Sequence, residues 1–181
     1  MRYFSVILLV VIAGCLSTPK NATPSGSFFY AEKAVAFTSA GRKDLFSIVA
    51  LGPDTLDALV LFSIRNAAGD TIYLDSLNSA SFCGTGEDPD STHDPLFVTS
   101  VGRKSLLFRG LHDFFADSRF DRPAIAFDTL RDVPYADSLV WNELRHDSGA
   151  VGFRYNKYLD AEIGVAYSKI QHKVVEYYAT P

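Results

Sequence analysis

Residues 59–74 read Leu-Val-Leu-Phe-Ser-Ile-Arg-Asn-Ala-Ala-Gly-Asp-Thr-Ile-Tyr-Leu, and this stretch decides the fold class. Two runs rich in β-forming residues flank the polar segment 66–70, and such a pattern is typical of a β-hairpin. Another apolar run, residues 45–51, precedes them and ends at Gly52-Pro53-Asp54. We therefore predict an antiparallel meander over residues 44–82, with an earlier strand at residues 28–37.

The periodicity changes after the polar segment 83–96. Apolar residues then recur at helical spacing: Leu107, Phe108, Leu111, Phe114 and Phe115. This pattern predicts a helix over residues 103–118, in which Gly110 costs about 1 kcal/mol relative to alanine, so burial of the aromatic face has to stabilise it. A second, shorter helix is predicted over residues 137–145, with an apolar face that contains Trp141.

The C-terminal third returns to strands. Apolar runs at residues 150–155, 163–168 and 173–178 predict three of them, and the polar segment 169–172 predicts a second hairpin. The order strands, helix, strands favours an α+β fold: an antiparallel sheet of about five to seven strands with one main helix packed across a face. The alternative is a β-sandwich, which the long helical pattern disfavours.

Composition bounds the kind of protein. The chain has 181 residues, is 48% hydrophobic and carries a formal net charge of −4. These values fit a single globular domain, which we place at residues 28–181, and they exclude a disordered chain or a coiled coil. An acidic balance gives no reason to expect nucleic acid as a partner.

The first fifteen residues resemble the signal of a bacterial lipoprotein. Arg2 is followed by a short apolar run, too short to span a membrane, and then by Ile12-Ala13-Gly14-Cys15. This ending resembles a lipobox, in which the peptidase cuts before the cysteine and lipid is attached to its thiol. We therefore expect a signal peptide at residues 1–14 and lipidation of Cys15. The alternative is an ordinary secretory signal that contains a cysteine.

A polar segment with two prolines follows Cys15, so residues 15–27 are predicted to be a lipidated cysteine and a flexible tether. Leu16, rather than aspartate, comes after the cysteine. By resemblance to Gram-negative sorting, this favours the outer membrane, with the domain facing the periplasm. Cleavage would leave Cys83 as the only unlipidated thiol. An intramolecular disulfide would then be excluded, and we interpret Cys83 as a small buried apolar residue.

Little in the sequence indicates metal or catalytic chemistry. Oxygen-bearing side chains alternate at Asp88, Asp90, Thr92 and Asp94, like calcium ligands. However, His93 and Thr99 stand where a calcium loop needs glycine and glutamate, which favours a solvated loop. No histidine has zinc-ligand spacing, and His112-Asp113 are helix neighbours whose side chains diverge. We expect no cofactor and lean towards a protein without enzymatic activity.

Tyrosines gather near the C-terminus: Tyr155, Tyr158, Tyr167, Tyr177 and Tyr178. Such a group is found on sugar- or peptide-binding faces, and equally on half-buried sheets where tyrosine is simply a good strand residue. Both interpretations stay open at this point.

One short pattern, aspartate followed by serine or threonine and then an apolar residue or threonine, recurs six times where composition predicts about one. It resembles the acceptor sequence of a general O-glycosylation system that acts on envelope proteins of one large Gram-negative phylum. The candidate acceptors are Thr55, Thr71, Ser76, Ser91, Thr129 and Ser138. The alternative is structural, because such pairs also begin turns and helices.

Three stretches together resemble a group of small Gram-negative outer-membrane lipoproteins with no assigned activity: Phe120–Ile125, Trp141–Phe153 and Ala166–Tyr177. The likeness covers most of residues 43–178. It implies an anchored protein with a strand–strand–helix part and a shared ending, and it implies no active site. Those relatives often finish in paired cysteines, whereas this chain ends Tyr178-Ala-Thr-Pro181, so any metal or redox role of such cysteines is not expected here.

The sequence therefore predicts a membrane-anchored envelope lipoprotein that is a non-enzymatic binding or structural module, with an envelope protein or glycan as its partner; it does not identify a more specific role. A second hypothesis is a small envelope-protecting inhibitor or ligand-binding module that uses the tyrosine-rich C-terminal hairpin and the loop at 83–96. A third is a hydrolase with a site assembled from distant residues, which short motifs do not reveal.

Overall fold

The computed structural model describes residues 25–52, 55, 57–82, 99–126, 136–158 and 161–180. Its first sheet contains four consecutive strands, β1 (Ser27–Ser39), β2 (Arg42–Leu51), β3 (Leu59–Arg65) and β4 (Thr71–Asn78). All neighbours pair antiparallel in the order β1-β2-β3-β4, which confirms the predicted meander.

Asp44 fastens one end of this first sheet. Its carboxylate is fully buried and accepts hydrogen bonds from the backbone N–H groups of Phe37, Thr38 and Ala67, and from the Thr38 hydroxyl. The pairing register of β1 and β2 shifts at this point, between Val35 and Ser39. One side chain thus satisfies the amides that the register shift and the β3–β4 turn leave unpaired.

The second sheet also has four antiparallel strands, in the order β5-β6-β7-β8. They are β5 (Phe120–Asp121), β6 (Gly152–Asn156), β7 (Glu162–Ser168) and β8 (Lys173–Ala179). The predicted C-terminal strands and the hairpin between β7 and β8 are confirmed, whereas the two-residue β5 was not predicted.

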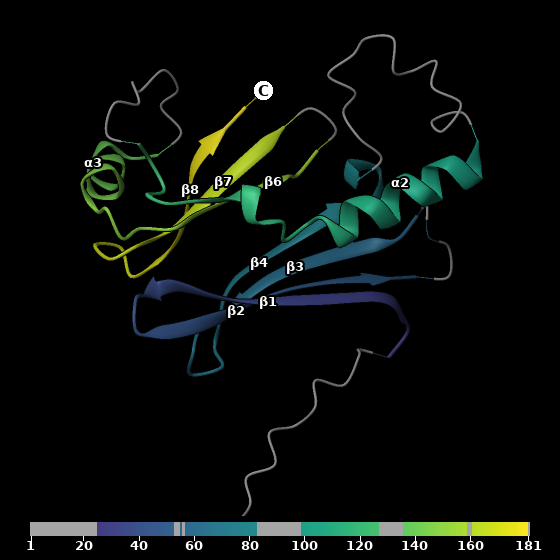
Figure 1. Ribbon diagram of the computed structural model, residues 1–181, viewed down its shortest axis with the longest axis horizontal. Helices are drawn as coiled ribbons and strands as arrows, with labels where there is room; N and C mark the ends of the chain where they lie inside the picture. The colour runs from purple at the N-terminus through teal and green to yellow at the C-terminus, as the bar shows by residue number, and fades with distance from the viewer. Residues whose placement is uncertain are drawn as a thin grey trace, which may run out of the picture.

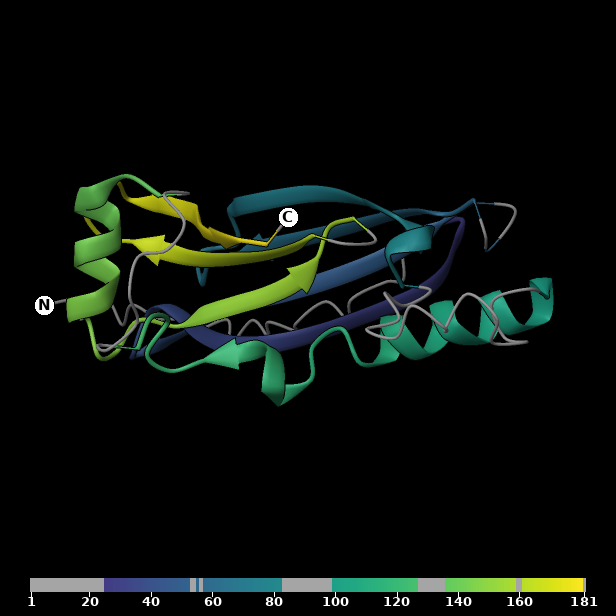
Figure 2. The same cartoon turned by 90° about the horizontal axis from the view of Figure 1, so that it is seen from above.

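Among the described residues, two α-helices lie at opposite ends of the structure, α2 (Ser100–His112) and α3 (Ser138–His146) (Figure 2). Thr99 caps α2 by accepting from the Gly102 amide, and Asp137 caps α3 by accepting from the Leu139 amide. Two short 3₁₀ helices accompany them, η1 (Ser79–Phe82) and η3 (Asp117–Arg119).

The predicted helix at 103–118 is too long, because α2 ends at His112. The following amides bond back to Arg109 and Leu111, and the chain turns so that Phe114 and Phe115 reach the core from irregular backbone. Gly110 stands where α2 touches η1: a Cβ there would lie 3.0 Å from the Phe82 carbonyl oxygen. Close approach of the two elements therefore explains a glycine inside the helix.

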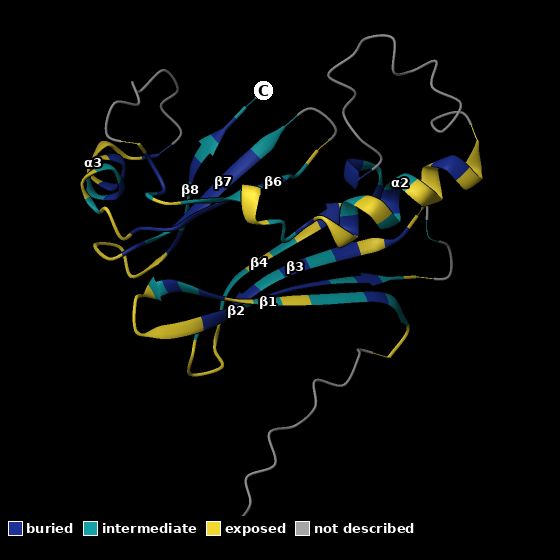
Figure 3. Ribbon diagram, viewed as in Figure 1, coloured by how far each residue is buried: buried dark blue, intermediate teal, exposed yellow. Residues whose placement is uncertain are grey.

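The main core lies between the two sheets and is dominated by aromatic rings (Figures 1 and 3). Phe46 of β2 and Phe62 of β3 both contact Phe153 of β6, with centroid distances of 5.4 and 5.3 Å. Buried Leu107 and Leu111 bring α2 into the same cluster. A smaller apolar cluster around Trp141 joins α3 to β7 and β8.

The mixed α+β class is confirmed, but the single sheet of five to seven strands is wrong. The strands divide into two sheets of four, whose aromatic faces contact each other instead of continuing one ladder. The face-to-face contact of two sheets matches the alternative prediction, a β-sandwich. The helices α2 and α3 nevertheless place the fold in the mixed α+β class. Among the described residues, none of the helices is long and apolar enough to cross a membrane.

Candidate functional site

A part-buried polar network joins the two sheets. The Tyr73 and Tyr155 hydroxyls lie 2.6 Å apart, and Tyr155 donates to Asp75 Oδ2 at 2.7 Å. Lys157 Nζ lies 3.0 Å from the same Asp75 oxygen and 3.9 Å from Glu176 Oε1. Residues from β4, β6 and β8 therefore meet in one hydrogen-bonded group.

The pKa shifts in this network indicate that it stabilises the contact between the sheets. Burial raises the pKa of both tyrosines, and the neighbouring carboxylates reinforce the effect, so both hydroxyls stay neutral. Burial alone would lower the pKa of Lys157, but Asp75 and Glu176 outweigh it and the pKa is raised. A neutral hydroxyl with a raised pKa is a poor base or nucleophile at neutral pH. The network therefore holds the sheets together without offering an activated group.

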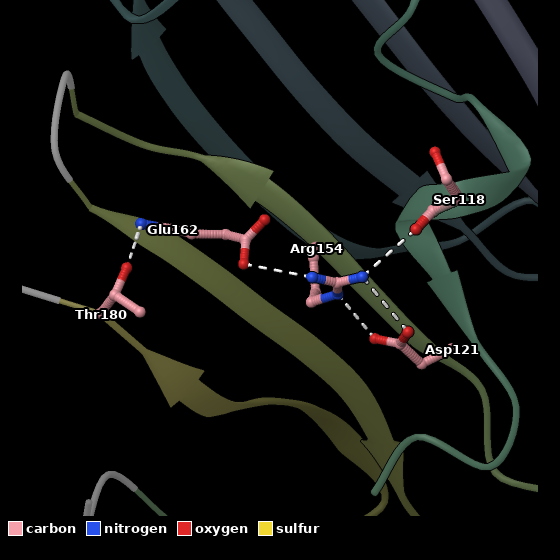
Figure 4. A network of polar contacts seen from close by, with 5 residues as sticks. All are labelled: Ser118, Asp121, Arg154, Glu162 and Thr180. Carbon is pink, nitrogen blue, oxygen red and sulfur yellow. Dashed lines mark hydrogen bonds and ion pairs between the residues drawn. The ribbon is translucent and has the colours of Figure 1, made fainter. Parts of the chain in front are cut away.

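A second network centres on Arg154 in the middle of β6 (Figure 4). Its Nε donates to Asp121 Oδ2 at 2.7 Å, and its Nη2 lies 3.4 Å from Asp121 Oδ1, in a two-pronged contact. The remaining donors reach Glu162 Oε2 at 3.4 Å and the Ser118 carbonyl oxygen at 3.2 Å. Although burial opposes it, the carboxylates raise the pKa of Arg154. One side chain thus fixes η3, β5, β6 and β7 relative to one another.

An aromatic pocket of about 310 Å³ opens beside Arg154 and Asp121. Trp141 and Tyr177, which are only 7% and 4% exposed, line it together with the equally buried Ala124 and Ile125. The full lining consists of one ion pair, a short apolar segment and three aromatic rings: Asp121, Pro123, Ala124, Ile125, Ala126, Trp141, Arg154, Tyr177 and Tyr178. Apolar rings with a few fixed polar groups at one side are typical of a small-molecule binding site. We call this the aromatic pocket.

Gly152 makes room for the Tyr177 ring in this pocket. A Cβ at Gly152 would lie 2.3 Å from the Tyr177 hydroxyl oxygen. That hydroxyl makes no hydrogen bond to the described part of the chain, and burial raises its pKa, so it remains a neutral donor. A buried tyrosine hydroxyl usually has a partner. The pocket therefore presents a donor that a ligand oxygen would satisfy.

Many of the sequence-predicted site residues lie outside the described residues: Cys15, Cys83, Asp88, Asp90, Ser91, Asp94 and Thr129. Within the described ranges, no group of three or more His, Cys, Asp or Glu residues is placed to hold a metal ion. The tether before Ser25 and the loop at 83–96 likewise fall outside what the structure describes.

The described candidate acceptors for O-glycosylation differ in accessibility. Thr71, Ser76 and Ser138 are exposed, whereas the Thr55 hydroxyl is buried and has no hydrogen-bond partner. Structural roles account for two of the neighbouring aspartates, because Asp75 belongs to the inter-sheet network and Asp137 caps α3.

The C-terminal tyrosines do not share one face. Tyr155 is fully buried between the sheets, Tyr177 lines the aromatic pocket beside half-buried Tyr178, and Tyr158 is 63% exposed. Tyr155 is therefore not part of an exposed face, whereas Tyr177 and Tyr178 line one pocket.

Sequence reasoning missed the Arg154 network and the pocket next to it. The available signal was Arg154 itself, a charged residue between the apolar strand neighbours Phe153 and Tyr155. A charge within such a strand needs a partner, but its distance in sequence from Asp121 gave no means of identifying that partner. No family model, curated protein or solved structure matches this chain.

Proposed function

We propose that this chain is an outer-membrane lipoprotein, anchored through Cys15, whose domain binds an envelope glycan in the aromatic pocket and performs no catalysis. The observation that carries the binding role is the combination of Trp141 and Tyr177 with the fixed Asp121–Arg154 pair. Flat rings offer an apolar surface to the carbon face of a sugar, while the ion pair and the Tyr177 hydroxyl face its hydroxyl groups.

Lipid anchoring is tested by removal of the thiol. Each buried methylene of an acyl chain contributes about 0.8 kcal/mol of membrane affinity, so the several chains of a lipidated cysteine hold firmly. We expect Cys15→Ala to move the protein into the soluble envelope fraction. The matched control is Cys83→Ala, which should stay with the membrane. Retention of the Cys15→Ala variant in the membrane contradicts the anchor.

Glycan binding is tested with the protein's own fluorophore. Trp141 is the single tryptophan of the chain and lines the pocket, so its emission reports occupancy. We expect oligosaccharide fragments of the cell wall to change that emission saturably in the detergent-solubilised full chain. Tyr177→Phe, which removes one hydrogen-bond donor, should weaken binding about fivefold to tenfold. Tyr167→Phe is the control outside the pocket, and equal affinities for both variants contradict the proposal.

A protein partner is the second candidate, in line with a small envelope-protecting inhibitor. A hollow of about 550 Å³ lies on another part of the surface and is bordered by Lys157 and by two exposed apolar side chains, Leu59 and Tyr158. Exposed apolar side chains around a hollow are common where proteins dock. Tight 1:1 binding of a purified envelope hydrolase, lost in Tyr158→Ser, supports this function, and its absence leaves the glycan role alone.

We also propose O-glycan attachment at one or two of the exposed acceptors Thr71, Ser76 and Ser138. Their hydroxyls are accessible in the folded domain, unlike that of Thr55. Intact-mass measurement on protein from its native envelope should show sugar-sized additions beyond the lipid. Additions of lipid size alone contradict the modification.

A further inference from the structure

A second cavity, of about 280 Å³, lies between α2, η1, η3 and the end of β6. It shares no lining residue with the aromatic pocket. α2 and η1 lie side by side here (Figure 1), and Gly110 allows their close approach. Its volume is at the lower limit for ligand sites, which are about 300–1,000 Å³, so the cavity suits a small molecule.

Two guanidinium groups line this cavity, that of exposed Arg109 and that of half-buried Arg119. Within the described ranges, neither side chain makes a hydrogen bond or an ion pair, and the neighbouring Glu162 is already paired with Arg154. Arg119 is half-buried, and the desolvation lowers its pKa even though Glu162 and Asp113 oppose the effect. An uncompensated guanidinium in a partly dry site is costly, and an anion would offset that cost.

The rest of the lining is divided between apolar and neutral polar groups. Phe82 and Phe114 are 9% and 2% exposed, and their rings lie 5.7 Å apart, so with Leu106 they form an apolar wall. Asn156 also lines the cavity, and its side-chain amide has no hydrogen bond among the residues described. Asp113 is the one carboxylate among the described lining residues.

We propose that this cavity binds a small carboxylate with a branched or aromatic apolar body. The carboxylate pairs with Arg119 and Arg109, whose planar donors match a carboxylate in a two-pronged contact. The apolar body packs on Phe82, Leu106 and Phe114. Asp113 repels a second negative charge, which selects a monocarboxylate over phosphate, and it accepts an ammonium group where the ligand carries one.

The ligand can therefore come from two sources, a free apolar amino acid or a simple fatty carboxylate. Three probes of one carbon skeleton separate them: leucine, isocaproate, which lacks the amine, and isopentylamine, which lacks the carboxylate. Inorganic phosphate is the fourth probe. Binding is measured by calorimetry and thermal shift on the detergent-solubilised full chain, with Arg119→Gln as the test variant and Arg42→Gln, an exposed arginine on β2, as the control.

We expect isocaproate to bind saturably and isopentylamine not to bind. Arg119→Gln should weaken the affinity for isocaproate at least tenfold, roughly the effect of losing a charge-assisted contact, while Arg42→Gln leaves it unchanged. If leucine binds more tightly than isocaproate and Asp113→Asn removes the difference, we infer that the ligand is an amino acid. If leucine and isocaproate bind equally, we infer that the ligand is a simple carboxylate. Both results support the site.

Stability in the absence of ligand gives an independent readout. Because the Arg119 guanidinium makes no hydrogen bond or ion pair with the described residues and is partly desolvated, Arg119→Gln should unfold at the same temperature as the parent or higher. A large loss of stability in Arg119→Gln would show that the charge is part of the framework, which overturns the proposal. No saturable carboxylate binding at millimolar concentrations, binding of phosphate alone, or unchanged affinity in Arg119→Gln also overturns it.

Discussion

The inter-sheet tyrosine pair is the most informative place to perturb the fold. Tyr155→Phe removes one hydroxyl and leaves the ring, so contacts such as that with Phe62, at 5.2 Å between centroids, remain. The hydroxyl makes two hydrogen bonds, one to Tyr73 and one to the Asp75 carboxylate. A neutral hydrogen bond contributes about 0.5–1.5 kcal/mol and one to a charged group about 1.5–3 kcal/mol, so we expect a loss of roughly 2–4 kcal/mol.

The same variant should change the response to alkali. The pKa values of Tyr73 and Tyr155 are raised in the folded protein, whereas the pKa of tyrosine in an unfolded chain is about 10. When the pH exceeds the pKa of unfolded tyrosine, the unfolded chain loses phenol protons that the folded chain retains. The free energy of unfolding is therefore at its full value below that pKa and decreases as the pH rises above it. Each such tyrosine contributes a slope of about 1.4 kcal/mol per pH unit. Tyr155→Phe should remove one of these contributions.

Urea denaturation followed by circular dichroism, at neutral pH and at several alkaline pH values, measures both effects. Tyr167→Phe is the matched control, because Tyr167 is half-buried on β7 and its hydroxyl makes no hydrogen bond to any described residue. Its free energy of unfolding should change by less than about 0.5 kcal/mol. Equal stabilities of the two variants, or an unchanged alkaline slope in Tyr155→Phe, would refute the view that this pair joins the sheets.

Three further changes test other parts of the fold by the same denaturation assay. Asp44→Ala should cost about 3–5 kcal/mol, because it removes the acceptor of the buried Phe37 amide and of the part-buried Thr38 and Ala67 amides, and a loss below about 1 kcal/mol would mean that water replaces the carboxylate. Gly152→Ala should cost about 1–3 kcal/mol and shift Trp141 emission as Tyr177 is displaced, while Gly41→Ala, which meets nothing within 4 Å, should not. Asp137→Ala should cost about 1 kcal/mol through loss of the α3 cap, and Asp137→Asn much less.

Local structure followed closely from the sequence. Alternation and β-forming residues gave β2, β3 and β4, and the Asn66–Asp70 segment forms the predicted turn, with Gly69 at a φ of 97°. α3 begins and ends within a residue of its prediction. In each of these cases neighbours in the sequence decide the outcome, so patterns of a few residues suffice.

Long-range structure could not be predicted in the same way. Phe114 and Phe115 fit helical spacing and a turn equally well, and only the position of the core around Phe153 decides between them. Likewise, nothing in the strand patterns states whether β4 pairs with a later strand or stops at the sheet edge. The aromatic pocket depends on Asp121, Arg154 and Trp141, which come together because β5 pairs with β6 and α3 packs on the second sheet.

The division of the strands into two sheets also affects the order in which the chain folds. The first sheet is built from residues 27–78 alone, and it can pair fully before the residues of the second sheet are available. Until then, the rings of Phe46 and Phe62 have no cover from Phe153. A partly folded intermediate of this kind exposes the aromatic face of the first sheet, and exposed apolar surface favours aggregation. If the chain is exported from its N-terminus, as we propose, it passes through this state on every synthesis, and we expect its yield to depend on chaperones that shield the exposed face.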